Sequence, residues 1–192
     1  MRMGMAMKMI LSAMVLSVAV AVGETEYTYG EDLVKQDGVP AGKVTKHVWK
    51  GSDLFEGTAR EYYVYVPAQY DGSEAAALMV FQDGHTCVKE GGDFRVPVVF
   101  DNLIAKGEMP VTVAVMVNPG WFVDGLEKAQ GWKAPKGVRS NRSVEYDTLS
   151  AAYVGLLEKE ILPEVEKTVN LSKDPAKRAI LPESLRWLWR KD

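Results

Sequence analysis

Hydrophobic and polar positions follow two different periods along the chain, which predicts a succession of strands and helices. Residues 43–49 alternate with a period of two. Residues 60–66 are rich in β-branched and aromatic residues and stop at Pro67, as strands often do. Continuous apolar runs over 76–82 and 111–117 are bounded by turn residues. Such runs predict strands that are buried on both faces of a sheet.

Helical spacing of apolar residues is found in two other segments. Residues 98–106 form the shorter one, and residues 149–169 form a longer amphipathic one that we expect Pro163 to kink or restart. A further strand is predicted to begin at 177–181, whereas the Gly-containing stretch 121–141 has no clear period and predicts a long loop.

Buried strands that alternate with helices predict an α/β fold, with a mostly parallel sheet and helices on both faces. The tyrosine-rich strands before the first helix predict an antiparallel N-terminal meander that joins this sheet. We therefore expect one domain over 43–181, in line with the usual size of about 100–200 residues.

The N-terminal residues 1–23 have the pattern of a secretory signal peptide. Arg2 and Lys8 precede an apolar run over 9–22 that contains an A-x-A site at 19–21. The run is shorter than the ~20 residues of a membrane-spanning helix, although an uncleaved anchor is the alternative. The pattern predicts a secreted or periplasmic protein with no stable membrane span, whose mature chain starts with a loose polar lead-in over residues 24–42.

Charge and composition exclude several function classes. The 23 basic and 26 acidic residues give a net charge of −3 and no basic face for nucleic acid. Cys87 is the single cysteine, which excludes an internal disulfide and a cysteine-based zinc site, and we expect it to be a partly buried structural residue. His47 and His85 are the two histidines, so no metal site and no cofactor are predicted.

Seven short segments occur in the order in which one protein family carries them: 60–67 (REYYVYVP), 78–84 (LMVFQDG), 99–104 (VFDNLI), 117–120 (VNPG), 141–147 (NRSVEYD), 160–165 (EILPEV) and 178–180 (RAI). Through them the chain resembles the secreted esterases of the α/β-hydrolase fold, which include enterochelin esterases, esterase D and feruloyl esterases. The resemblance implies that residues 43–181 are the N-terminal part of a hydrolase domain. For the full-length family it implies a small-molecule or carbohydrate-linked ester as substrate.

In that family the strand corresponding to 178–180 leads into a Gly-x-Ser-x-Gly-Gly elbow, which exposes the nucleophile. Here Ser184 stands at the nucleophile position, but Pro182 and Arg186 replace the flanking glycines. We expect this elbow to be broken and residues 182–192 to be an aberrant tail, as a frameshift would produce. The resemblance then implies a domain truncated at the elbow, without the acid and the histidine of the triad and therefore inactive.

The segment Asp83-Gly84-His85-Thr86 follows a buried strand, and the resemblance implies that Gly84 and His85 contribute to an oxyanion hole. An ordinary turn at the end of a strand is the alternative. We do not expect His85 to be the general base, because this fold places the base after the nucleophile. His47 is expected at the surface or at a sheet edge.

Two further groups of residues have open interpretations. Arg142 and Glu145 form either an ion pair at the start of a helix or a substrate contact. The aromatic residues of the long loop, Trp121, Phe122 and Trp132, either line a ligand cleft or pack the loop against the domain. The alternatives to an inactive esterase are a secreted non-catalytic ligand-binding protein and a short active esterase, which would need a histidine near Ser184.

Overall fold

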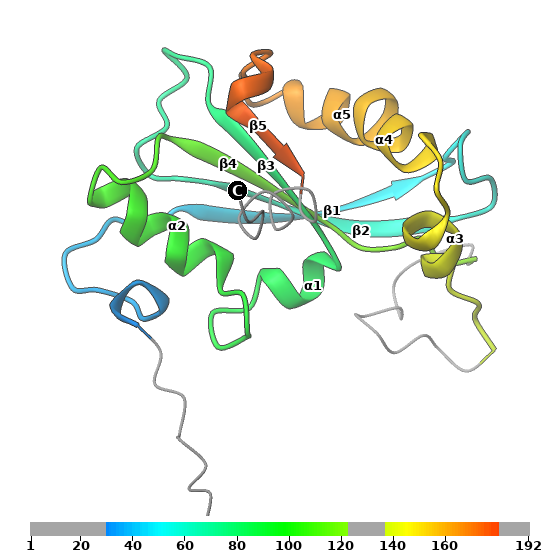
Figure 1. The fold of residues 1–192 in the computed structure, drawn as a ribbon, viewed down its shortest axis with the longest axis horizontal. Coiled ribbons are helices and arrows are strands. Elements are labelled where there is room, and N and C mark those ends of the chain that lie inside the picture. The colour runs from blue at the N-terminus through cyan, green and yellow to red at the C-terminus, as the bar shows by residue number, and fades with distance from the viewer. Residues whose placement is uncertain (1–29, 123–136, 181–192) are drawn as a thin grey trace, which may run out of the picture.

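The computed structural model describes residues 30–122 and 137–180, which form a five-stranded sheet with helices on both faces (Figure 1). The strands lie in the order β1-β2-β4-β3-β5. Their bounds are β1 (Lys43–Lys50), β2 (Ala59–Val66), β3 (Ala77–Gln82), β4 (Thr112–Val117) and β5 (Arg178–Ile180). Each of the five strands predicted from the sequence is present.

The pairing changes direction in the middle of the sheet. β1 pairs with β2 and β2 with β4 in antiparallel fashion, whereas β3 pairs in parallel with both β4 and β5. The α/β sheet with flanking helices and antiparallel N-terminal strands is therefore confirmed. Among the described strands, parallel and antiparallel pairings are equal in number, so this part of the sheet is mixed and not mostly parallel as predicted.

The central position of β4 follows from its sequence. All six residues of Thr112–Val117 are buried, as expected of a strand that has a neighbour on each edge and helices on each face. β1 is the opposite case, because none of its residues is buried and it has one strand neighbour in the described part of the chain. The hydrophobic pattern thus separates the central strand from the edge strand.

The helical segments connect the strands and cover the sheet. In chain order they are η1 (Glu31–Leu33), α1 (Gly84–Cys87), α2 (Val96–Ala105), α3 (Arg142–Asp147), α4 (Ala152–Leu156), η2 (Leu157–Ile161), α5 (Leu162–Glu166) and η3 (Pro175–Lys177). α2 lies on one face of the sheet, and α4 and α5 lie on the other (Figure 1). The predicted helix 98–106 corresponds to α2, which begins two residues earlier with Pro97 in its first turn.

The predicted long helix 149–169 is divided into three abutting segments over 152–166. Its middle segment, η2, is a π-helix, and Pro163 stands in the first turn of the α-helix that follows. Proline has no N–H to donate to the preceding turn, so a wider turn just before it resolves the conflict. Pro163 therefore restarts the helix without ending it.

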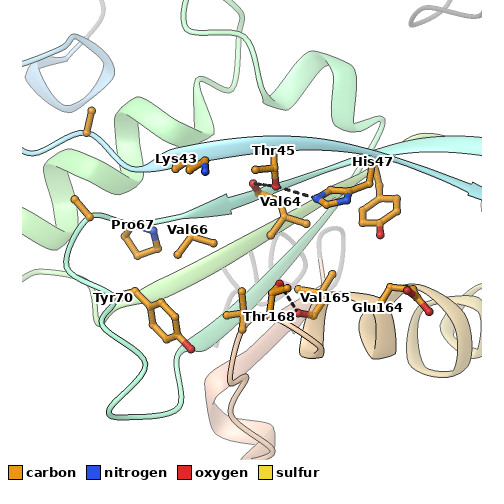
Figure 2. A pocket seen from close by; sticks show the side chains of 14 residues that line it. Lys43, Thr45, His47, Val64, Val66, Pro67, Tyr70, Glu164, Val165 and Thr168 are labelled. Atoms are coloured by element: carbon orange, nitrogen blue, oxygen red, sulfur yellow. Dashed lines mark hydrogen bonds between the residues drawn. The ribbon is translucent and has the colours of Figure 1, made fainter. Parts of the chain in front are cut away.

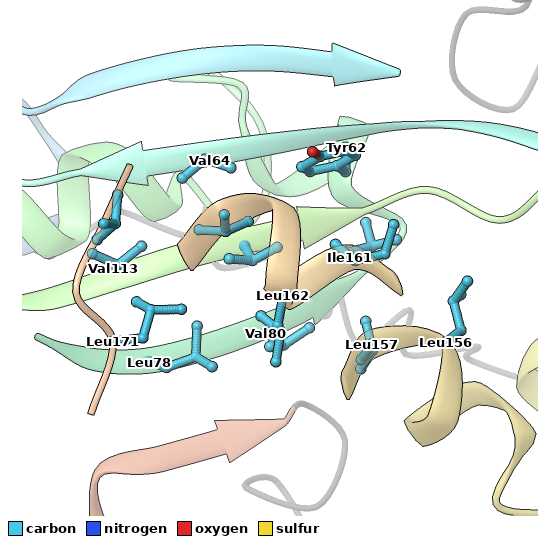
Figure 3. Close-up of a cluster of buried hydrophobic side chains, with 14 of the residues drawn as sticks. Tyr62, Val64, Leu78, Val80, Val113, Leu156, Leu157, Ile161, Leu162 and Leu171 are labelled. Atoms are coloured by element: carbon cyan, nitrogen blue, oxygen red, sulfur yellow. The ribbon is translucent and has the colours of Figure 1, made fainter. Parts of the chain in front are cut away.

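Each face of the sheet has its own hydrophobic core. The larger cluster lies between the sheet and α4–α5 and includes Val80, Val115, Leu157 and Ile161, all with at most 1% exposure (Figure 3). The smaller cluster packs α2 against the opposite face. Both faces are covered over the centre of the sheet, which fixes the positions of the strand ends.

The lead-in is not loose over its described part, 30–42. The side chain of Asn102 on α2 donates to the carbonyl oxygens of Asp32 and Val34, at 2.9 and 2.8 Å. Arg95 donates to the carbonyl of Leu33 at 2.9 Å. The predicted signal peptide lies outside the described residues, and no helix within them is long and apolar enough to cross a membrane.

Candidate functional site

The candidate site lies where β3 and β4 end side by side. The two strands are parallel, and Gln82 and Val117 are paired at their carboxyl ends. Asp83 follows β3 and Asn118 follows β4 directly. In α/β proteins the carboxyl edge of the parallel strands is where ligands and catalytic residues usually gather.

Asp83 adopts a backbone conformation that non-glycine residues rarely take. Its φ of 52° and ψ of 46° lie in the left-handed region. Arg142 is the first residue of α3, and it donates two hydrogen bonds to the carboxylate of Asp83, from Nε at 3.0 Å and from Nη2 at 2.6 Å. Such strain persists where the surroundings fix it, and it occurs often at functional sites.

Tyr146 completes the support of this turn. The hydroxyl of Tyr146 donates to the carbonyl of Val117 at 3.3 Å and accepts from the amide of Asp83 at 3.4 Å. The Arg142 guanidinium lies 5.1 Å from the centre of the Tyr146 ring. Burial raises the pKa of Tyr146 well above its usual value, so its hydroxyl remains a donor throughout the physiological range.

Gly84 lies too close to β4 to carry a side chain. A Cβ at this position would lie 2.3 Å from both the carbonyl carbon and the carbonyl oxygen of Met116. The first turn of α1 therefore passes directly over the backbone of β4. This close approach brings the turn after β3 against the end of β4.

His85 is held by Asn118 through two atoms. Its backbone amide donates to Asn118 Oδ1 at 2.9 Å, and its Nδ1 lies 2.8 Å from the same oxygen. The side chain is buried, with 6% of its surface exposed. The backbone amide of His85 is therefore already bonded to Asn118. It could donate to an oxyanion only if that bond broke. The predicted role of Gly84 does not depend on breaking that bond.

Glu145 and Arg142 pair with different partners, so the predicted ion pair between them is not formed. Glu145 accepts from both terminal nitrogens of Arg60 on β2, at 2.6 and 3.1 Å, and neither side chain is exposed. It also accepts from the Gly120 amide at 3.1 Å and from Asn141 Nδ2 at 2.9 Å. The charge of Glu145 is thus fully compensated inside the protein, and its position fixes α3 against β2.

This arrangement makes α3 the bridge between the core and the site. Glu145 anchors the helix to the buried end of the network, and Arg142, three residues earlier, extends toward Asp83. The two residues that the sequence singled out therefore have separate structural roles. A substrate contact by either of them stays a prediction.

The remaining candidates are structural or lie elsewhere. Cys87 is 1% exposed, and burial raises its pKa to about 11, which agrees with a structural residue rather than a nucleophile. Trp121 is buried and forms bridges with Ala59 and Ser140, so it packs the start of the loop. His47 is exposed on β1, as expected.

Some sequence-predicted residues cannot be placed. Trp132, Ser184 and the residues that flank Ser184 lie outside the described part of the chain. β5 ends at Ile180, which is paired with Val80 near the carboxyl end of β3. The carboxyl end of β5 therefore lies at the same edge of the sheet as the Asp83–His85 turn. Among the described residues, no group of His, Cys, Asp and Glu could hold a metal ion.

Sequence reasoning missed the partners that hold the turn. Asn118 carries a signal that could have found it, because it directly follows a buried strand just as Asp83 does. Arg60 lies in a mostly buried strand. An arginine in such a strand needs an acidic partner, and this is the sequence signal that points to a residue such as Glu145.

Several solved structures share this fold at low sequence identity. A ferulic acid esterase of Anaeromyces mucronatus matches with a TM-score of 0.54 and 18% identity, over 80% of this chain and 53% of that chain. The enterobactin esterase FES of Shigella flexneri matches with a TM-score of 0.53 and 17% identity, over 78% of this chain and 31% of that chain. The present chain thus spans about half the length of the first of these proteins and about a third of the second.

The comparisons also include a feruloyl esterase module of Clostridium thermocellum, with a TM-score of 0.50 and 15% identity, over 80% of this chain and 48% of that chain. No curated protein sequence matches the chain. The family model described as "Putative esterase" matches residues 55–185, which include the sheet from β2 to β5 and the whole candidate site. The chain therefore belongs to the esterase family.

Proposed function

We propose that this chain contains the oxyanion-hole turn of a carboxylic ester hydrolase but does not itself hydrolyse esters. The Asp83–His85 turn at the carboxyl edge of β3 supports the first part of this proposal. Gly84 begins α1 there, at the position where a backbone donor can stabilise a tetrahedral oxyanion. The strained conformation of Asp83 and its clamp by Arg142 are the features of a turn that is built to hold one geometry.

The state of the two histidines supports the second part and carries the proposal. His85 directs both its amide and Nδ1 to Asn118, so it is committed to a structural contact. His47 lies on β1, three strands away from β3 in the order of the sheet. A serine nucleophile needs a histidine that is free to act as its base. The contacts of His85 with Asn118 and the place of His47 on β1 both argue against that role.

The elbow sequence adds a second obstacle. The strained strand-to-helix turn of a nucleophile elbow needs small residues beside the serine, because neighbouring backbone approaches closely there. Ser184 is flanked by Pro182, which fixes φ and lacks an N–H, and by Arg186, which brings a long side chain. These replacements argue against activation of Ser184.

For the ester chemistry of related full-length proteins, the solved structures suggest the substrate class. One neighbour is a ferulic acid esterase whose structure was determined with ferulic acid, and another is an esterase of enterobactin. We infer small-molecule esters as the class to test.

The proposal is tested by steady-state assays of the purified chain on short p-nitrophenyl esters and on methyl ferulate. We expect neither a burst nor turnover above that of a Ser184→Ala control. Turnover that disappears in Ser184→Ala would overturn the proposed inactivity and would favour a short active esterase.

We also propose that the chain is exported by residues 1–23, on the basis of the basic start, the apolar run and the A-x-A site. Mass spectrometry of the protein recovered from the periplasm or medium should find an N-terminus near Val22 or Glu24. An intact Met1 in protein recovered from the cytoplasm would contradict export.

A further inference from the structure

An open groove lies between the antiparallel end of the sheet and α5, on the face opposite α2 (Figure 2). Its volume is about 620 Å³, within the range of about 300–1,000 Å³ that is usual for small-molecule sites. β1 and β2 form one wall and the floor, and α5 with the residues after it forms the other wall. The groove is thus separate from the candidate site at the ends of β3 and β4.

The floor of the groove is aliphatic. Val64 and Val66 on β2 face Val165 and Val169 from the helical side, and three of these four valines are at most 5% exposed. Branched aliphatic side chains favour a flexible hydrocarbon over a flat aromatic ring, because they offer no ring face to stack on. The floor therefore suits an alkyl chain.

A cation stands at one end of the groove. Lys43 is paired in register with Val66 at the end of β2, and Pro67 and Tyr70 close this end of the groove. The Lys43 ammonium has no ion-pair partner within the part of the chain that the structure describes. This end can therefore accept an anionic group from a ligand.

Hydrogen-bonding groups stand at the other end. The ring of His47 stacks on that of Tyr62, with centroids 5.0 Å apart and planes at 17°. Tyr62 is 4% exposed, and its hydroxyl has no hydrogen-bond partner among residues 30–122 and 137–180. The hydroxyl is not among the buried polar atoms that lack a partner in this part of the chain, so it is open to the groove and can bond to a ligand atom there.

Glu164 fixes the polarity of this second end. Glu164 and Tyr62 both line the groove, and burial, followed by the charge of Glu164, raises the pKa of Tyr62. Lys167 neutralises part of that charge through contacts of 2.7 Å. The end near Tyr62 therefore disfavours an anion and suits a neutral hydroxyl, which can accept from Tyr62 and donate to Glu164.

We propose that this groove binds a medium-chain hydroxy fatty acid, with its carboxylate at Lys43, its alkyl chain over the valine floor and its hydroxyl at Tyr62. Lys43 and His47 are four residues apart on one strand, a separation of about 13 Å. An extended chain of eight carbons is about 9 Å long, and its terminal oxygens with their hydrogen bonds cover the rest of that distance. This site needs no nucleophile, so it stands or falls independently of the proposed ester chemistry.

The test uses three probes of equal chain length: ω-hydroxyoctanoate, octanoate and the terminal octanediol. Calorimetry with the full chain measures affinity, and amide chemical shifts locate the bound probe. We expect the hydroxy acid to bind most tightly, with shifts on β1, β2 and residues 164–169. Octanoate should lose about fivefold and the diol about tenfold, since each lacks one polar contact.

Four variants separate the contributions. Lys43→Gln should weaken the hydroxy acid about tenfold but leave the diol unchanged, whereas Lys50→Gln, farther along β1 and outside the groove, should change neither. Tyr62→Phe should weaken the hydroxy acid but not octanoate. Thr168→Trp, at an exposed position on the rim, should block all three probes.

Three results would overturn the proposal. The first is that none of the probes binds to the folded chain. The second is that the diol binds as tightly as the hydroxy acid, which would exclude the contact with Lys43. The third is that the shifts centre on Asp83–Thr86, which would place the ligand at the candidate ester site instead.

Discussion

Arg142 clamps Asp83 across 59 residues of sequence, with two hydrogen bonds to a carboxylate whose backbone is held at a φ of 52°. The pair links the first residue of α3 to the turn that follows β3. Because α3 is anchored separately through Glu145, the turn is fixed from outside its own sequence. This relationship makes the geometry of the candidate oxyanion turn dependent on a helix that comes later in the chain.

Arg142→Met should loosen the turn without unfolding the domain. The pair is partly exposed, with 36% of the Arg142 side chain accessible, so its loss should cost about 1 kcal/mol or less. We expect the amides of Thr86 and Val88 to exchange hydrogen about fivefold faster. Arg142→Lys keeps the charge but loses the paired geometry, so it should give an intermediate rate. Unchanged exchange in both variants would show that the clamp does not hold the turn.

The buried pair of Arg60 and Glu145 should behave differently. Removing one partner leaves an uncompensated charge in a fully buried place, so Glu145→Leu or Arg60→Leu should each lower the free energy of unfolding by about 3–5 kcal/mol. The double variant should be less destabilised than the sum of the two, because it leaves no charge unpaired. Urea denaturation of the three variants measures this coupling. Additive losses would contradict a direct pair.

Gly84→Ala should be strongly destabilising because of space, not backbone conformation. The new Cβ would lie 2.3 Å from the backbone of Met116, which cannot move without disturbing β4. Gly91→Ala is the matched control, since nothing lies within 4 Å of a Cβ there. We expect a fall in soluble yield and thermal midpoint for the first variant alone. Equal midpoints for both would show that the turn can shift away from β4.

Lowering the pH should weaken the contact between β1 and the helices on its face, because Glu160 holds Trp49 of β1 by a hydrogen bond. Burial would raise the pKa of Glu160, but donors that include Trp49 Nε1 at 2.8 Å and the amides of Asp53 and Leu54 outweigh it and lower that pKa below 4.5. The contribution to stability is thus complete above the unfolded pKa and is lost as pH falls through the lower folded value. Glu160→Gln should reduce the fall in stability below pH ~4.5, measured by urea denaturation. An identical acid profile would exclude this role.

The sheet could be predicted from the sequence because each of its strands has a local signal. The apolar residues of 111–117 and the tyrosine-rich residues of 60–66 predict buried strands, and the residues next to each run predict where the strand ends. The turn after β3 was found for the same reason, since Asp83 and Gly84 follow such a run directly. Local pattern was therefore sufficient for the elements and for the edge where the site lies.

The contacts that hold the site could not be predicted in the same way. Arg142 and Glu145 are three residues apart on one helix, where an ion pair between them is the natural expectation. Their actual partners, Asp83 and Arg60, are set by packing of α3 against strand ends that are 59 and 85 residues away. The groove that contains Tyr62 likewise depends on the packing of α5 beside β2, which no local sequence pattern shows.

The central claim, an esterase-family domain without a competent nucleophile, is tested most directly by covalent labelling. A fluorophosphonate reacts with a serine that a neighbouring base has activated, and the mass of the intact protein shows whether one equivalent has been added. We predict no adduct on the purified chain under conditions that fully label a functional serine esterase used as a positive control. A stoichiometric adduct at Ser184 that is absent from Ser184→Ala would contradict the claim.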